Sequence, residues 1–136
     1  MNAHGLLVNV DVDDLERGKR FYCEGLGLRV GRQFDGWVEL VGRDAPIYLL
    51  PKEPGTEAFP KGTRRSYGRH WTPVHLDFVV EDIAAAIRRA VAAGATVESE
   101  VSTHPYGKLA LLADPFGNGF CLLEFTGGGY DEITVR

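Results

Sequence analysis

Apolar and polar side chains alternate through residues 6–12, which is the pattern of a β-strand with one buried face. The apolar face holds Leu6, Val8, Val10 and Val12, and the mixed face holds Leu7, Asn9 and Asp11. Asp13 and Glu16 then have the spacing of a capping box, in which each side chain bonds the backbone amide of the other. We therefore predict a helix from this point to about Glu24, ended by Gly25 and Gly27.

Three further strands are predicted after this helix. They begin at Leu28, Trp37 and Ile47, and the segments 35–36 and 42–44 supply the turns between them. Pro51 ends the last strand because proline has no N–H to donate to a strand ladder. The order of elements is therefore βαβββ over about residues 5–51.

The same order follows over about residues 74–126. Residues 74–80 alternate like the first strand, and Asp82 precedes a helical stripe of apolar residues at 83, 86, 87, 90 and 91. Strands are predicted over 96–98, 109–112 and 120–125. The last two flank the turn 114–119, where Pro115 presets φ and the glycines tolerate positive φ, so they form a hairpin.

The two halves repeat one another. Leu7 lies seven residues before the helix residue Asp14, and His75 lies seven residues before its counterpart Asp82. Two copies of a unit that is too small to bury a core alone predict one domain with pseudo-twofold symmetry.

Residues 52–73 connect the halves and are rich in proline, glycine and basic residues. An irregular connection of this length is usually either functional or disordered. Two interpretations stay open for it: a solvated linker, or a lid in which Arg64, Arg65 and Arg69 close over an anionic ligand.

Composition narrows the classes of partner. The chain has 136 residues, which suits one domain, and its net charge of −4 gives no electrostatic reason to bind nucleic acid or an anionic membrane. We find no apolar run of about 18 residues and no signal-peptide pattern. The two cysteines, Cys23 and Cys121, form no CxxC motif and fit a reducing compartment. These features predict a cytoplasmic protein.

Motifs in both halves carry a family resemblance. They are Asp14-Leu15, Phe21-Tyr22, Leu26-Gly27-Leu28 and Asp114-Pro115-Phe116-Gly117-Asn118. Together with the duplication, they make the chain resemble the vicinal oxygen chelate superfamily over about residues 5–126. That superfamily includes glyoxalase I, bleomycin-resistance proteins and extradiol dioxygenases. The resemblance implies a single α+β domain over residues 1–136, in which two βαβββ modules in pseudo-twofold arrangement form curved mixed sheets that enclose a cavity. Residues 127–136 are then a tail.

In metal-dependent members of the superfamily, the ligands lie on the first and last strands of each module. The matching positions here are Leu7, Tyr48, His75 and Cys121. Leu7 has no donor atom, the tyrosine hydroxyl has a reference pKa of about 10, and an apolar strand opposes formation of a thiolate. Glu124 lies on the opposite strand face from Cys121. We therefore expect no metal and no other cofactor, unless His4 or His70 joins His75.

The same concave face is expected to form a pocket for a small molecule. Its predicted residues are Leu7, Asn9, Trp37, Glu39, Tyr48, His75, Asp77 and Cys121. The prediction is a metal-free small-molecule binding protein whose ligand the sequence does not identify. The alternative is a glyoxalase-like lyase or a dioxygenase-related enzyme that acts on a small oxygenated substrate, with His75 as the candidate general base. The resemblance also implies a homodimer, to which the tail 127–136 would contribute.

Overall fold

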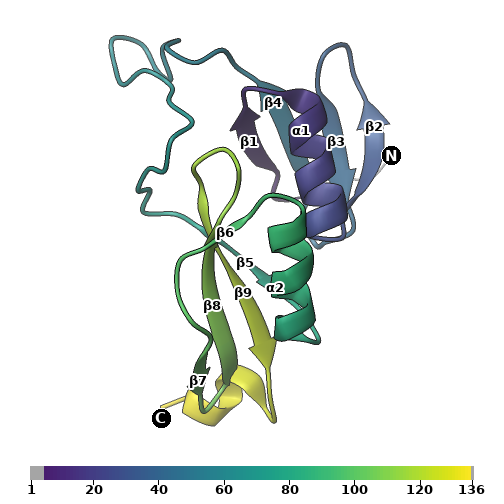
Figure 1. The fold of residues 1–136 in the computed structure, drawn as a ribbon, viewed down its shortest axis with the longest axis vertical. Helices are drawn as coiled ribbons and strands as arrows, with labels where there is room; N and C mark the ends of the chain where they lie inside the picture. The colour runs from purple at the N-terminus through teal and green to yellow at the C-terminus, as the bar shows by residue number, and fades with distance from the viewer. Residues whose placement is uncertain (1–4, 136) are drawn as a thin grey trace.

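The computed structural model describes residues 5–135, so His4 lies outside the described residues. It contains two α/β modules joined by a long linker (Figure 1). Module one consists of β1 (Val8–Val12), α1 (Leu15–Arg20), the π-helical turn η1 (Phe21–Gly25), β2 (Arg29–Gln33), β3 (Val38–Val41) and β4 (Ile47–Pro51). Its four strands lie in the order β1-β4-β3-β2, with β1 parallel to β4.

The start and end of the first helix differ from the sequence prediction. Asp14, not Asp13, is the N-cap residue, and its carboxylate accepts a 3.0 Å hydrogen bond from the amide of Arg17. The α-helix ends at Arg20 and continues as the wider turn η1. Within this turn Phe21 and Tyr22 are adjacent in sequence and both buried.

Module two repeats the arrangement with one added strand. It consists of β5 (Leu76–Val79), α2 (Ile83–Ala92), β6 (Thr96–Val97), β7 (Ser102–His104), β8 (Gly107–Ala113), β9 (Gly119–Phe125) and the 3₁₀ turn η2 (Gly129–Ile133). The strand order is β5-β9-β8-β6, and β7 pairs with β8. Strand β7 was not predicted because its residues are polar and carry no apolar alternation.

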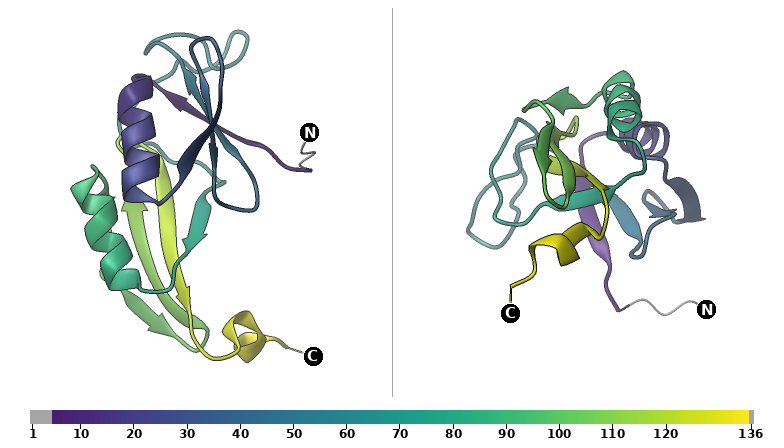
Figure 2. Two further views of the ribbon diagram at one scale, coloured as in Figure 1. Left: turned by 90° about the vertical axis from the view of Figure 1, so that its right-hand side faces the viewer. Right: turned by 90° about the horizontal axis from the view of Figure 1, so that it is seen from below.

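Both helices lie on the same side of the two sheets (Figure 2, left). Val12 of β1, on the strand face predicted to be apolar, is completely buried, as are Leu49 of β4 and Leu122 of β9. Leu6, predicted on the same face as Val12, precedes β1 and is exposed. The sheets and their helices confirm the α+β fold with two repeated modules. The two sheets share no strand pairing within residues 5–135, so they form two open layers and no closed barrel.

The predicted hairpin between β8 and β9 is present, and Asp114 organises its turn. The Asp114 carboxylate accepts hydrogen bonds from the amides of Phe116 and Asn118 at 2.8 and 2.9 Å. Phe116 is fully buried, and its ring lies edge-on to Tyr67 of the linker. The turn is therefore a packing element between the modules as well as a strand connection. No helix within residues 5–135 has the length and apolar character needed to span a bilayer.

Candidate functional site

Three of the predicted pocket residues form a cluster on module two. His75 immediately precedes β5, and Asp77 of β5 lies directly opposite Cys121 of β9. The Nε2 atom of His75 is 3.1 Å from Oδ1 of Asp77, and one donor atom of each residue lies within 4.8 Å of the others. The alternation of the strands therefore brings an imidazole, a carboxylate and a thiol together, as the sequence predicted for His75 and Asp77.

Cys121 is an unreactive member of this cluster. Its burial, followed by the negative charge and the hydrogen bond of Asp77, raises the pKa of the thiol to about 12. In the absence of a metal the side chain is therefore a neutral thiol near neutral pH, and a neutral thiol is a weak nucleophile.

Two open clefts meet at His75. One, of about 200 Å³, lies between β1 and β5 and is lined by residues that include Asn9. The other, of about 180 Å³, lies over β8 and β9 and is lined by residues that include Trp71, Leu111 and Cys121. Both clefts are also lined by Thr72, His75, Gly119 and Phe120. We call the two together the His75 cleft.

Trp71 and Leu111 give the His75 cleft exposed apolar surface that the sequence analysis missed. Trp71 is 82% exposed and Leu111 is 45% exposed. Leu111 pairs with Cys121, so the alternation along β8 was a signal that would have placed it on this face. Trp71 comes from the irregular linker, where no periodic pattern exists.

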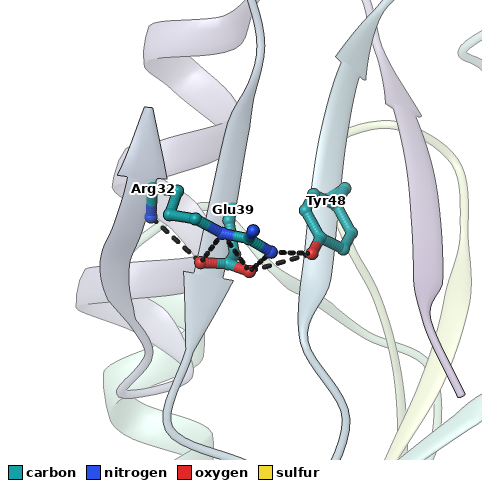
Figure 3. Close-up of polar contacts among 3 residues, drawn as sticks. All are labelled: Arg32, Glu39 and Tyr48. Atoms are coloured by element: carbon teal, nitrogen blue, oxygen red, sulfur yellow. Dashed lines mark hydrogen bonds and ion pairs between the residues drawn. The ribbon is translucent and has the colours of Figure 1, made fainter. Parts of the chain in front are cut away.

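A second polar cluster, of Arg32, Glu39 and Tyr48, lies on module one (Figure 3), and none of the three residues lines the His75 cleft. Nε of Arg32, on β2, donates to both carboxylate oxygens of Glu39, and Nη2 donates to Oε2 at 2.7 Å. The hydroxyl of Tyr48 donates to the same carboxylate at 2.8 Å. These hydrogen bonds, chiefly those from Arg32, lower the pKa of Glu39 to about 2. Glu39 is therefore an ionised anchor that joins three strands.

Module one also supplies the predicted aromatic wall. Trp37 stacks on Phe34 with ring centroids 3.9 Å apart, and it lies 5.7 Å from the ring of Tyr48. Neither Trp37, Glu39 nor Tyr48 lines the His75 cleft. Three of the predicted pocket residues thus form a separate group on module one, apart from the cluster of His75, Asp77 and Cys121.

The other predicted residues take different positions. Asn9 lines the His75 cleft, whereas Leu7 is half exposed and does not line it. Arg32 was missed by the sequence analysis. The available signal was Glu39 itself, because a carboxylate predicted within a strand needs a cation on a neighbouring strand.

The four family ligand positions do not fit a hard divalent metal. Leu7 offers no donor atom, and the hydroxyl of Tyr48 already forms hydrogen bonds with Glu39 and Arg32. His75, Asp77 and Cys121 are the described side chains that would hold a cation, but the high pKa of the thiol and its softness oppose a hard, oxygen-liganded ion.

The linker arginines already have protein partners. Arg65 pairs with Asp11 at 2.7 Å, and Arg69 holds the carboxylate of Glu98 through two hydrogen bonds. Arg64 donates to the carbonyl of Gly55. The linker is therefore fastened to both modules, and Arg69 forms part of the rim of the His75 cleft.

Comparison with known proteins adds a family and two functional contexts. The chain matches the model of a family described as "Glyoxalase-like domain" over residues 7–123. It is 32% identical over 120 residues to the anthracycline biosynthesis protein DauV of Streptomyces sp. (strain C5), which covers 86% of this chain and 40% of that protein. The chain thus spans about two fifths of the length of this curated relative.

Two solved structures illustrate the structural likeness. TnmS3, an antibiotic binding protein from Streptomyces sp. CB03234, has a TM-score of 0.65 and 26% identity, over 92% of this chain and 98% of TnmS3. A glyoxalase/bleomycin resistance protein/dioxygenase family enzyme from Burkholderia phytofirmans PsJN has a TM-score of 0.71 and 21% identity, over 91% of this chain and 100% of that one. The second comparison bears on the fold alone.

Proposed function

Because the chain belongs to the glyoxalase-like domain family, we propose that it binds a planar aromatic small molecule in the His75 cleft without a metal ion. The observation that carries this proposal is the exposed indole of Trp71 beside Leu111 and His75 in one cleft. A tryptophan that is 82% exposed contributes little to the core. Its flat face is instead suited to stacking against an aromatic ring.

The polar groups of the cleft support a small, oriented ligand. His75, whose imidazole is paired with Asp77, lies among apolar side chains such as Trp71 and Leu111, and the cleft lining also includes polar residues such as Asn9 and Thr72. A binding pocket needs only a few such groups to fix the orientation of its ligand. The two adjoining clefts together reach the lower end of the usual range for ligand pockets, about 300 to 1,000 Å³.

The names of two of the compared proteins support an antibiotic-like ligand for this cleft. DauV is named for anthracycline biosynthesis, and TnmS3 is named for antibiotic binding. Anthracyclines are flat polycyclic aromatic compounds, which matches the chemistry of an exposed indole. We extend this ligand class to the present chain as a proposal, since the chain matches only part of DauV.

Isothermal titration calorimetry with an anthracycline tests the proposal. We expect binding by the wild-type chain and about tenfold weaker binding by Trp71→Ala, because the stacking surface is lost. The matched control is Phe59→Ala, which removes an exposed aromatic of the same linker that does not line the cleft. Equal binding by Trp71→Ala and the wild type would refute the stacking role.

A second candidate function is metal-free acid–base catalysis. It is favoured by the 3.1 Å contact between His75 and Asp77, in which the carboxylate orients the imidazole of a half-exposed histidine. Incubation of the ligand with the protein, followed by mass spectrometry, would detect a product. This candidate predicts that the wild type converts the ligand and that His75→Gln does not, although His75→Gln still binds it. That result would favour catalysis over simple binding.

A further inference from the structure

A separate cleft of about 470 Å³ lies where the two modules meet beside α2. Its apolar lining includes Leu26 after η1, Phe78 of β5 and Leu122 of β9. Leu122 faces the helix layer, whereas its neighbour Cys121 lines the His75 cleft, and Phe78 lines both clefts. The junction cleft therefore lies on the opposite face of β9 from Cys121, and its volume is within the range of ligand pockets.

Two arginines line the junction cleft, and each bridges from one module to the other. Arg43 of module one donates to the carbonyl of Val79 at 2.7 Å, and Arg89 of module two donates to the carbonyl of Glu24 at 2.6 Å. A guanidinium has five N–H donors, so both keep donors beyond these contacts. Neither arginine forms an ion pair with a carboxylate of residues 5–135.

Two carboxylates, of Glu81 and Asp82, also line the cleft, at the start of α2. Asp82 caps the helix by accepting from the amide of Ala85 at 3.1 Å. Arg89 lies seven residues further along the helix, which corresponds to about 10 Å. Arg89 is therefore well separated from Asp82 along the helix, whereas Arg43 contacts the end of β5, which is close to Glu81 in sequence. Because the cleft lining holds two cations and two carboxylates, a ligand with a single negative charge suits it better than a dianion.

We propose that the junction cleft binds a small amphipathic monoanion. Its carboxylate or sulfonate meets Arg43 and Arg89, and its apolar body covers Leu26 and Phe78. Because both arginines already join the modules, a bound anion links the modules through the same two side chains. This site is independent of the function proposed for the His75 cleft.

Titration with 8-anilinonaphthalene-1-sulfonate, followed by fluorescence and by calorimetry, tests the site. We expect Arg43→Met and Arg89→Met each to weaken binding about tenfold, since each removes charge-assisted hydrogen bonds to the sulfonate. The matched control is Arg88→Met, which removes an exposed arginine of the same helix that does not line the cleft. The uncharged analogue N-phenyl-1-naphthylamine is expected to bind more weakly than the sulfonate to the wild type.

A second pair of variants keeps the test decisive if an arginine variant folds poorly. Ala85→Phe fills the junction cleft and is expected to abolish binding, whereas Ala84→Phe places the same ring on an exposed helix position outside the lining. Trp71→Ala is expected to leave the arginine-dependent part of sulfonate binding unchanged, which separates this site from any binding of the aromatic dye in the His75 cleft. Unchanged binding by Ala85→Phe, or equal weakening by Arg88→Met and Arg89→Met, would overturn the proposal.

Discussion

The phenolic hydroxyl of Tyr22 donates a 2.6 Å hydrogen bond to Oδ2 of Asp114, and this contact joins the helical turn η1 of module one to the β8–β9 hairpin of module two. Both residues are about 5% exposed or less. Burial, reinforced by the charge of Asp114, raises the pKa of Tyr22 well above its usual value, so the hydroxyl remains a donor. The turn motif that carries the family resemblance thus also fastens the modules together.

Loss of this hydrogen bond is expected to destabilise the whole domain. Tyr22→Phe should lower the free energy of unfolding by about 1–2 kcal/mol, because it leaves the buried carboxylate of Asp114 with one partner fewer. Urea denaturation followed by circular dichroism measures this change. Tyr130→Phe is the control, since Tyr130 is 51% exposed, and its effect should stay within about 0.5 kcal/mol. A value for Tyr22→Phe as small as the control would contradict the prediction.

The pKa of Glu39 predicts how stability depends on pH. The native value of about 2 lies below the usual unfolded value of about 4.3, so ionised Glu39 stabilises the fold above pH 4.3. This contribution is lost as the pH falls from about 5 toward 2. Urea midpoints at pH 6 and pH 3 should therefore differ less in Glu39→Gln than in the wild type.

Glu100→Gln serves as the matched control for the pH experiment, because Glu100 is an exposed carboxylate in the segment between β6 and β7. Its pH dependence should match that of the wild type. If Glu39→Gln and Glu100→Gln lose the same stability between pH 6 and pH 3, the Arg32–Glu39 ion pair is not the cause of the pH dependence.

We predict that the purified protein carries no stoichiometric metal. Leu7 has no donor, Tyr48 is bonded to Glu39, and Cys121 is a thiol of high pKa. Elemental analysis after purification without a His-tag measures the metal content. About one equivalent of nickel, zinc, manganese or iron that disappears in His75→Ala would restore the metalloenzyme hypothesis.

A homodimer remains a prediction that follows from the family resemblance. Light scattering at micromolar concentration should give about twice the 14.9 kDa of one chain. The exposed residues Tyr130, Ile133 and Val135 of the tail are the apolar groups that a partner would cover. A mass equal to one chain at this concentration would argue against the dimer.

Local pattern determined the elements and the two-module repeat. The alternation in β1 and the helical stripe of α2 are short-range features, and the structure places Val12, Ile83 and Ala90 in the core as these patterns predict. Leu6 and Val91, at the ends of the two patterns, are exposed. The pairing of His75 with Asp77 was also accessible, because residues two apart on a strand share a face. The cap at Asp14 and the π-helical turn were missed, since helix ends depend on small differences between neighbouring residues.

Tertiary packing alone decided how the polar residues are grouped. Glu39 was predicted to line the same pocket as His75, but the register of β2, β3 and β4 pairs its carboxylate with Arg32 and Tyr48. Trp71 enters the His75 cleft because the linker is held across the modules, for which the sequence carries no periodic signal. Side-chain alternation follows from the geometry of one strand, whereas a cleft between modules depends on how separate segments pack, and that information is not local in the chain.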